Sequence, residues 1–173
     1  MERQRLKAEL LRDSLTGLYN RNALRESFNE MLRSGQRHVF AMVDLDHFKQ
    51  LNDTYGHPRG DICLREFAEV AQREADPHPV FRYGGDEFCI LFRLETPEEA
   101  AVICRRIHRQ LAQSATLSPL SLQASFGLAL YKPGMTPQQL LNHADRALYR
   151  SKCQEDPIAV FTENMEPSPA QAQ

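Results

Sequence analysis

The chain has 173 residues, of which 42% are hydrophobic and 25% are charged. This length and composition suit one globular domain and exclude a fibrous or wholly disordered chain. The formal net charge of −2, from 21 basic and 23 acidic residues, argues against a strongly basic nucleic-acid-binding protein.

The N-terminal residues 2–12 predict a short linker helix. Leu6, Leu10 and Leu11 fall on one helical face, and most of the other residues are charged. This pattern fits either a free helix or the last turns of a coiled linker that enters a domain, and fewer than two heptads are present to separate the two interpretations.

The next elements in chain order are a helix, a strand and a second helix. Asn20 is a candidate cap for a helix that runs to about Leu32. The apolar run from His38 to Leu45 contains β-branched and aromatic residues, which predicts a buried strand. Residues 60–73 then repeat apolar side chains at helical spacing, which predicts the second helix.

A tight hairpin is predicted in the middle of the chain. Residues 80–83 and 87–94 have the composition of strands. Gly84-Gly85-Asp86 between them is a strong turn signal, because glycine tolerates a positive φ. The sheet must therefore contain an antiparallel pair of strands.

The last third of the chain predicts two more helices, two strands and a tail. The predicted helices cover residues 97–113 and a segment that opens at Thr136-Pro137, and the predicted strands cover residues 120–131 and 157–161. Residues 163–173 have the composition of a disordered tail. Because helices alternate with strands around an antiparallel pair, we predict an α/β (α+β) sandwich, with helices on a mainly antiparallel sheet.

Cysteine spacing and hydropathy bear on the compartment. The four cysteines form no C-x-x-C pair, which favours reduced, mostly buried thiols. No run of 18 apolar residues occurs, and the charged N-terminus lacks the apolar stretch of a signal peptide. We therefore expect a cytoplasmic protein without direct membrane insertion.

Two acidic clusters stand next to predicted strand ends. Asp44 and Asp46 stand at the end of the strand at 38–45, and Asp86 and Glu87 lie in the glycine hairpin. If that strand lies beside the hairpin, the carboxylates converge, and their repulsion favours a divalent cation. Oxygen ligands favour Mg²⁺ or Mn²⁺ over Zn²⁺. Taken singly, Asp86 also fits an ordinary turn residue, and Asp44 or Asp46 a helix cap.

Several ordered motifs occur between residues 13 and 152. RYGGDEF stands at residues 82–88, DSLTGLYNR at 13–21, and DLDHFKQLNDTYGHPRGD at 44–61. Ser125-Phe126-Gly127 and DRALYRSK at 145–152 follow. Together, at this spacing, they resemble the GGDEF family, the diguanylate cyclases.

The resemblance implies a fold, an activity and partners. The fold would be the nucleotide-cyclase-like sandwich, a five-stranded sheet flanked by helices. The activity would condense two GTP into cyclic di-GMP and two pyrophosphates across a head-to-head homodimer, because each domain holds one GTP. The expected organisation is a linker helix at residues 1–12, the catalytic domain at 13–162 and a disordered tail at 163–173. We expect the linker helix to control dimerisation and to follow a sensory or regulatory domain outside this chain.

The resemblance also implies roles for individual residues. The implied metal ligands, for Mg²⁺ or Mn²⁺, are Asp44, the carbonyl of Leu45, Asp86 and Glu87. The implied catalytic residues are Asp86, Glu87 and Lys49. The implied substrate-binding residues are Asn52, His57, Asp61, Gly84, Gly85 and Lys152.

The implied roles of Asn52 and Asp61 have a chemical basis. Their side chains would read guanine, whose N1–H and N2–H₂ donors are absent from adenine, and Lys49 and Lys152 would meet the phosphates. Other interpretations stay open, with Asn52 as a turn residue, His57 as a structural hydrogen-bonding residue and Lys49 as a surface lysine.

Two sites depart from the family pattern. Asp156 stands where the family has a phosphate-binding arginine, and we expect its charge to repel phosphate and reduce GTP affinity or turnover. Ala75 and His78 stand where the family has the R-x-x-D product-inhibition motif, although Arg73 and Asp76 form such a tetrad two residues upstream. We therefore expect no strong product inhibition. The alternative function is a catalytically weak domain that binds GTP or cyclic di-GMP and signals through a partner.

Overall fold

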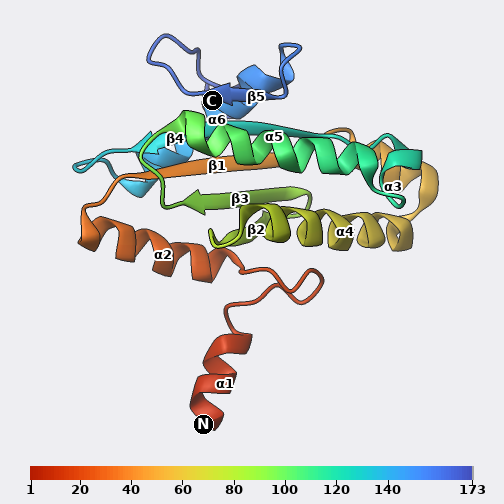
Figure 1. The fold of residues 1–173 in the computed structure, drawn as a ribbon, viewed down its shortest axis with the longest axis horizontal. Helices are drawn as coiled ribbons and strands as arrows, with labels where there is room; N and C mark the ends of the chain where they lie inside the picture. Colours follow the sequence, from red (N-terminus) through yellow and green to blue (C-terminus); the bar gives the residue numbers. More distant parts are fainter. Residues whose placement is uncertain (173) are drawn as a thin grey trace.

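A five-stranded sheet of order β2-β3-β1-β4-β5 forms the centre of the domain (Figure 1), in a computed structural model that describes residues 1–172. The strands are β1 (His38–Leu45), β2 (Val80–Gly84), β3 (Glu87–Phe92), β4 (Ala124–Tyr131) and β5 (Ile158–Val160). Three of the neighbouring pairs are antiparallel, and β5 runs parallel to β4. The predicted α/β sandwich with a mainly antiparallel sheet is confirmed.

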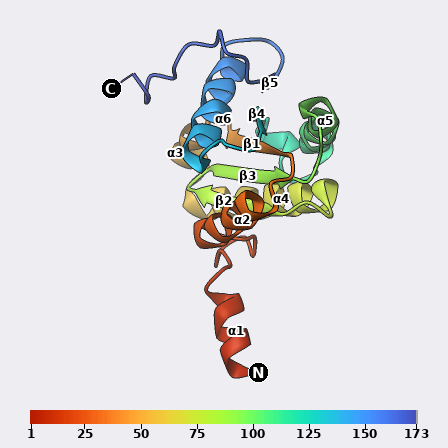
Figure 2. The same cartoon turned by 90° about the vertical axis from the view of Figure 1, so that its left-hand side faces the viewer.

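Six α-helices are present in residues 1–172. They are α1 (Glu2–Glu9), α2 (Arg21–Ser34), α3 (Phe48–Tyr55), α4 (His57–Ala75), α5 (Pro97–Gln113) and α6 (Pro137–Lys152). Figure 2 shows α4 and α5 on one face of the sheet and α2 and α6 on the other. The N-terminal helix α1 projects away from the domain.

Side-chain caps explain where three helices begin. The Asn20 side chain accepts hydrogen bonds from two amides in the first turn of α2, as the sequence predicted. Thr96 and Thr136 cap α5 and α6 in the same way. Each of these threonines stands directly before a proline at the first helical position, where the missing N–H of proline costs nothing.

The structure adds one helix that was not predicted and corrects two predicted boundaries. The sequence prediction missed α3, a helix of only eight residues that contains weak helix formers and depends on tertiary packing. The helix predicted at 60–73 begins earlier, at His57. The strand predicted from residue 120 begins at Ala124, because residues 118–120 form a 3₁₀ turn and Ser121 adopts a left-handed φ of 53°.

The central strand β1 is buried on both faces. Val39, Ala41 and Val43 pack into the cluster with α4 and α5, whereas Phe40 and Met42 pack into the cluster with α2 and α6. Because successive side chains of a strand point to opposite faces, the strand reads as one continuous apolar run. The apolar run ends at Asp44, which is only partly buried and lies at the C-terminal end of the strand.

Helix α6 lies very close to β4 because residue 127 is glycine. A Cβ at Gly127 would lie 2.1 Å from the backbone nitrogen of Leu148 and 2.3 Å from the carbonyl oxygen of Ala144. Neither distance is possible for a side chain. This close approach brings Lys152, the last residue of α6, to Asp44 at the end of β1.

The C-terminal residues that were predicted as a disordered tail lie over α6, as far as they are described. Ser168 Oγ donates a hydrogen bond to Asp145 at 2.7 Å, and the Gln171 side chain donates to the Asn142 carbonyl at 3.1 Å. Gln173 lies outside the described residues.

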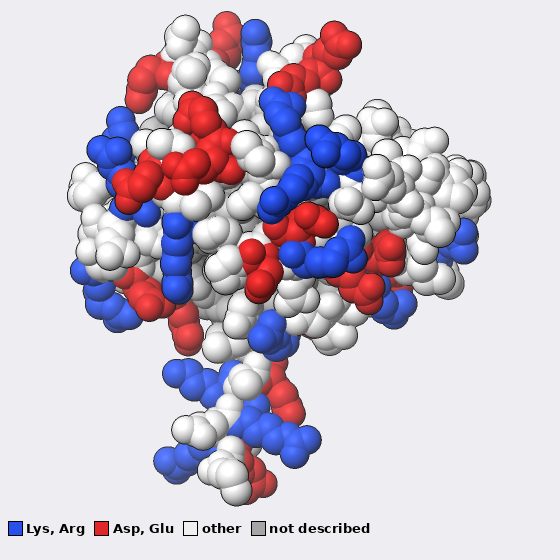
Figure 3. All heavy atoms as spheres, in the orientation of Figure 1, with Lys and Arg blue, Asp and Glu red and all other residues white. Residues whose placement is uncertain are grey.

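Surface charge, helix hydropathy and cysteine burial can be compared with what the composition predicted. Figure 3 shows acidic and basic side chains interspersed over the viewed face, with both signs on α1. Within residues 1–172, no helix combines the length and the apolar character needed to cross a bilayer. Three of the four cysteines are buried and Cys153 is exposed, so the prediction of mostly buried thiols is confirmed.

Candidate functional site

The end of β1 and the β2–β3 turn bring three carboxylates together. Strand register pairs Asp44 directly with Glu87. The Leu45 amide donates to the carbonyl of Asp86 at 3.2 Å, which ties the turn to β1. The end of β1 and the hairpin are therefore neighbours in the sheet, and we call Asp44, Asp86 and Glu87 the carboxylate cluster.

The members of the carboxylate cluster repel one another. Burial raises the pKa of Asp86, and the neighbouring charge of Asp44 raises it further. Partial burial raises the pKa of Glu87, as do the charges of Asp44, Asp86 and Asp145. The positive charge of Lys152 opposes both shifts. Raised pKa values in a group of neighbouring acids mark a candidate functional site.

Lys152 forms an ion pair with one oxygen of Asp44. Its Nζ contacts Asp44 Oδ2, and the side chains of Asp44 and Lys152 are 15% and 38% exposed. The other carboxylate oxygen, Asp44 Oδ1, is buried and has no hydrogen-bond partner. The protein therefore satisfies only half of this carboxylate.

The chemistry of the donors fits a hard divalent cation. The carboxylate cluster offers only oxygen ligands, and the Leu45 carbonyl belongs to the same strand end, which suits Mg²⁺ or Mn²⁺. The unpaired Asp44 Oδ1 is the kind of acceptor that such a cation would satisfy. Within the described part of the chain, no three His, Cys, Asp or Glu side chains already stand together as a metal-binding group. The fit thus rests on donor type and on the unpaired oxygen.

The glycine hairpin is tied to the N-terminal loop through Arg82. Its Nε and Nη2 donate to the carbonyl of Gly85 at 3.1 and 2.8 Å, and its Nη1 donates to the Asp13 carboxylate at 3.2 Å. Burial opposes the ionisation of Asp13, but hydrogen bonds from Thr16 and the charge of Arg82 outweigh it and lower the pKa of Asp13. Sequence reasoning gave Arg82 no role, although it opens the RYGGDEF motif.

Gly84 and Gly85 leave the hairpin backbone accessible. Both residues are exposed. A Cβ built at either would meet no heavy atom within 4 Å, and Gly85 has a φ of 26°. A ligand can therefore approach this backbone closely, as the sequence prediction required.

Asn52 fills the contact between α3 and α4. A Cβ at Gly60 would lie 1.8 Å from the Asn52 Oδ1, so glycine is needed for the two helices to meet. That oxygen is buried and accepts no hydrogen bond from the protein. An unsatisfied buried acceptor costs about 1–3 kcal/mol and requires an explanation. Asp61, the next residue of α4, is half-buried.

The structure does not draw every predicted residue into one cluster. Lys49, in the first turn of α3, is exposed, and so is His57, the first residue of α4. They share these two helices with Asn52 and Asp61, whereas Lys152 pairs with Asp44 in the carboxylate cluster, and Gly84 and Gly85 lie next to the cluster in the hairpin.

A cavity of about 560 Å³ lies along α3, from His47 at its start to Tyr55 at its end. Its lining includes Asp46, His47, Ser125 and Lys152. Ser125 Oγ donates to Asp46 Oδ1 at 2.8 Å, so this carboxylate is engaged outside the carboxylate cluster. His47 adopts a left-handed φ of 56°, and α3 begins without a side-chain cap. The free amides and dipole of a helix N-terminus favour an anion, and Lys152 joins this cavity to Asp44.

Asp156 is paired with α5. Arg105 donates to its two carboxylate oxygens at 3.0 and 2.8 Å, and the hydrogen bond from Arg105 lowers the pKa of Asp156. Glu155 and Pro157 line the cavity beside α3, but Asp156 is not among the lining residues. The charge of Asp156 is therefore paired with a guanidinium, and its repulsion of phosphate stays a prediction.

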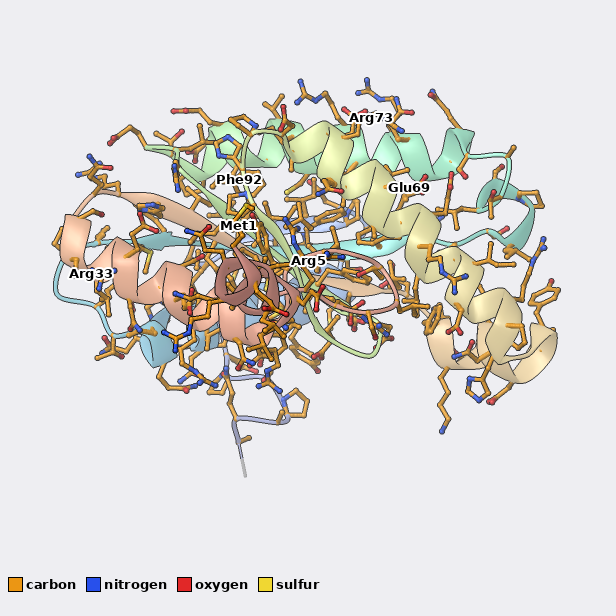
Figure 4. All side chains as sticks on the ribbon, turned by 90° about the horizontal axis from the view of Figure 1, so that it is seen from below. Met1, Arg5, Arg33, Glu69, Arg73 and Phe92 are labelled. Carbon is orange, nitrogen blue, oxygen red and sulfur yellow. The ribbon has the colours of Figure 1, made fainter. Side chains whose placement is uncertain are left out.

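The positions of the product-inhibition motif hold buried or engaged side chains. Ala75 is fully buried. The Nδ1 of His78 accepts a hydrogen bond from the Arg93 amide at 3.1 Å, and its ring meets Phe92 edge-on at 5.3 Å. Figure 4 shows Arg73 on the outer edge of the molecule, where its side chain is 61% exposed.

The fold and the site define an α/β domain with a carboxylate cluster beside a cavity that α3 and Lys152 line. The family described as diguanylate cyclase, GGDEF domain, matches residues 10–156. The chain belongs to this GGDEF family.

Curated relatives share about a third of their residues with the chain. The diguanylate cyclase DgcS of Shewanella oneidensis is 33% identical over 159 residues, which are 88% of this chain and 53% of DgcS. The bifunctional diguanylate cyclase/cyclic di-GMP phosphodiesterase MucR of Pseudomonas aeruginosa is 35% identical over 152 residues, which are 83% of this chain and 22% of MucR. The chain thus spans only part of the length of these relatives.

Solved structures show the same architecture. The coiled coil and GGDEF domain of DgcB from Caulobacter crescentus, in complex with c-di-GMP, is 31% identical with a TM-score of 0.82, over 92% of this chain and 89% of that one. The diguanylate cyclase SiaD of Pseudomonas aeruginosa, in complex with its activator SiaC, is 36% identical with a TM-score of 0.81, over 93% of this chain and 65% of that one. The fold predicted from the motifs is therefore the fold of this family.

Proposed function

We propose that the chain is a diguanylate cyclase that condenses two GTP into cyclic di-GMP and releases two pyrophosphates, in a metal-dependent reaction in the cytoplasm. The observation that carries this proposal is the carboxylate cluster, which is joined by Lys152 to the cavity beside α3.

The carboxylate cluster and the Leu45 carbonyl would hold Mg²⁺ or Mn²⁺. Such an ion supplies neutralisation of the α-phosphate charge and lowers the pKa of the attacking 3′-hydroxyl. Asp86, whose pKa is raised by burial and by Asp44, is suited to accept the proton of that hydroxyl. Glu87 keeps the local charge negative and supports the same ion.

The triphosphate would lie along the first turn of α3. The free amides of that turn and the ammonium groups of Lys49 and Lys152 match phosphate oxygens. Gly84 and Gly85 would let the hairpin backbone approach the phosphates, since no side chain stands in the way.

Asn52 and Asp61 would select guanine. The buried Oδ1 of Asn52 lacks a donor, and the N1–H and N2–H₂ groups of guanine are donors of the required kind. Adenine would leave these acceptors unpaired, and a site built on such hydrogen bonds rejects the wrong base strongly. We place His57 at the wall of the same pocket.

Catalysis would require a homodimer. One domain holds one GTP, so two domains must face each other for each 3′-hydroxyl to meet the other α-phosphate. Leu6 and Leu10 are 56% and 69% exposed on α1, which extends away from the domain (Figure 1). We assign to this helix the control of dimerisation by a preceding regulatory domain.

The proposal is tested by incubating the protein with GTP and Mg²⁺ and measuring cyclic di-GMP. We expect product from the wild-type protein, none from Asp86→Ala, and a rate that rises more steeply than the first power of enzyme concentration. The absence of product at any enzyme concentration would contradict the cyclase activity.

A second candidate function is a module that binds GTP or cyclic di-GMP and signals through a partner. The observation in its favour is Asp156, which replaces the family's phosphate-binding arginine. Tight GTP binding without product formation would favour this function over the enzyme. In either case we expect no strong product inhibition, and a tight cyclic di-GMP complex at Arg73 and Asp76 would overturn that expectation.

A further inference from the structure

Lys152 belongs to two neighbouring sites at once. Its Nζ contacts Asp44 Oδ2 in the carboxylate cluster, and its side chain also lines the cavity beside α3. Among the ion pairs of residues 1–172, the pair of Lys152 with Asp44 is the one that includes a member of the carboxylate cluster. It is thus the cation that balances the cluster within the protein itself.

Helix α6 fixes the place of the Lys152 backbone, whereas the Lys152 side chain is free to change direction. The preceding residue, Ser151, is buried, and its Oγ donates to the carbonyl of Leu148 at 2.6 Å. The close approach at Gly127 fixes the helix against the sheet. The Lys152 side chain itself is 38% exposed, so its flexible four-carbon stem can change direction without moving the helix.

An ammonium group that pairs with Asp44 weakens the binding of a metal ion to the same carboxylate. The ammonium contacts Oδ2, and its positive charge repels a divalent cation that approaches the cluster. A triphosphate in the cavity would offer the ammonium a more highly charged partner at its other side. The two positions of one side chain would then be alternatives, one without nucleotide and one with it.

From this geometry we propose that Lys152 is a resident counter-ion that holds the metal site closed until a triphosphate draws it away from Asp44. Metal binding and nucleotide binding are therefore coupled through one lysine, and the nucleotide-free protein binds divalent metal weakly. This regulation rests on the proposed function, because the triphosphate is what releases the lysine.

The test measures metal binding without nucleotide. Mn²⁺ is titrated into the full chain and free Mn²⁺ is followed by electron paramagnetic resonance, for the wild type, Lys152→Gln and Lys49→Gln. Lys49→Gln is the matched control, since it removes the same charge from a lysine that is also assigned to phosphate but forms no ion pair with Asp44. Asp44→Asn in the Lys152→Gln background shows whether the titrated ion uses Asp44.

We expect Lys152→Gln to bind Mn²⁺ about fivefold more tightly than the wild type, as the loss of a partly exposed ion pair suggests, and Lys49→Gln to be unchanged. The tighter binding should disappear in the double variant. Equal or weaker binding by Lys152→Gln, including no measurable binding by either protein, overturns the proposal. So does an equal gain in Lys49→Gln, because general charge then explains the effect.

A second measurement follows Lys152 directly. The chain contains four lysines, Lys7, Lys49, Lys132 and Lys152, so ¹³C-dimethylated lysines give few NMR signals, and Lys152→Gln assigns one of them. We expect a GTP analogue that cannot react to shift the Lys152 signal before any metal is added. If the analogue binds and the Lys152 signal does not move, the coupling is wrong and the proposed function stands. If the analogue does not bind while Lys152→Gln still tightens Mn²⁺, the proposed function fails and the counter-ion role stands.

Discussion

Asp13 is linked to the Gly85 carbonyl through Arg82, and Asp86 directly follows Gly85 in the chain, yet the pKa values of these two acids move in opposite directions. Asp13 accepts from Thr16 and pairs with Arg82, which lowers its pKa against the effect of burial. Asp86 is partly buried next to Asp44, and both the burial and the charge of Asp44 raise its pKa. The protein provides hydrogen bonds and a positive charge for the Asp13 carboxylate, whereas it leaves the Asp86 carboxylate next to the like charge of Asp44.

This difference separates structural acids from candidate functional acids. Asp156 behaves like Asp13, since Arg105 pairs with both of its oxygens. Glu87 behaves like Asp86. A carboxylate whose interactions lie within the protein contributes to stability, whereas a repulsive cluster lowers stability and persists for another reason. The contrast leads to four experiments.

The largest effect is expected for Asp86→Asn. Product formation should fall about 100- to 1000-fold, as for other groups that stabilise charge in a transition state. The free energy of unfolding in urea at pH 7 should stay equal or rise, because the substitution removes repulsion from Asp44. A fall of more than about 1 kcal/mol, the average for point mutations, would place Asp86 among the structural acids instead.

Arg82→Ala should destabilise the fold by about 2 kcal/mol, since hydrogen bonds to charged groups contribute about 1.5–3 kcal/mol each and this pair is largely but not fully buried. The substitution leaves Asp13 without its guanidinium and removes two donors from the Gly85 carbonyl. Arg21→Ala is the control, because Arg21 stacks on the nearby Tyr83 ring at 4.2 Å and donates to its hydroxyl at 3.1 Å, but forms no ion pair with a carboxylate in residues 1–172. Chemical unfolding that gives equal losses for both variants would refute the special role of Arg82.

The pH dependence of stability should distinguish the two acids by sign. A lowered native pKa stabilises the fold above the unfolded pKa, and this is lost as pH falls through the native value. Asp13→Asn should thus be less stable than the wild type at pH 7, with the deficit vanishing in acid. A raised native pKa destabilises the fold at neutral pH, so Asp86→Asn should gain stability at pH 7 and lose that gain as pH falls through the raised pKa. Urea titrations between pH 7 and pH 3 measure both trends, and trends of the same sign would break the comparison.

The smallest effect is expected for Asp156→Asn. The Arg105 and Asp156 side chains are 50% and 43% exposed, and such pairs contribute at most about 1 kcal/mol. GTP affinity measured by calorimetry should change less than about twofold, because the lost charge is already paired. Asp156→Arg restores the family's residue but sets a guanidinium against Arg105. A marked gain in GTP affinity in Asp156→Asn would show that the carboxylate does act on phosphate.

Much of the fold followed from local patterns in the sequence. Asn20, the apolar run at 38–45 and Thr136-Pro137 marked their elements because capping and strand periodicity depend on neighbouring residues only. The glycine hairpin likewise forced an antiparallel pair. The motifs identified the family, and the two acidic clusters at strand ends predicted the carboxylate cluster.

Only the tertiary structure decided which acids are paired. Arg82 lies 69 residues from Asp13, Arg105 lies 51 residues from Asp156, and Lys152 lies 108 residues from Asp44. Such contacts depend on how close two elements approach, as Gly127 allows for α6, and no local pattern encodes that distance. The sequence alone therefore identified the acidic residues of the candidate site. Packing decided which acidic residues are paired with a basic side chain.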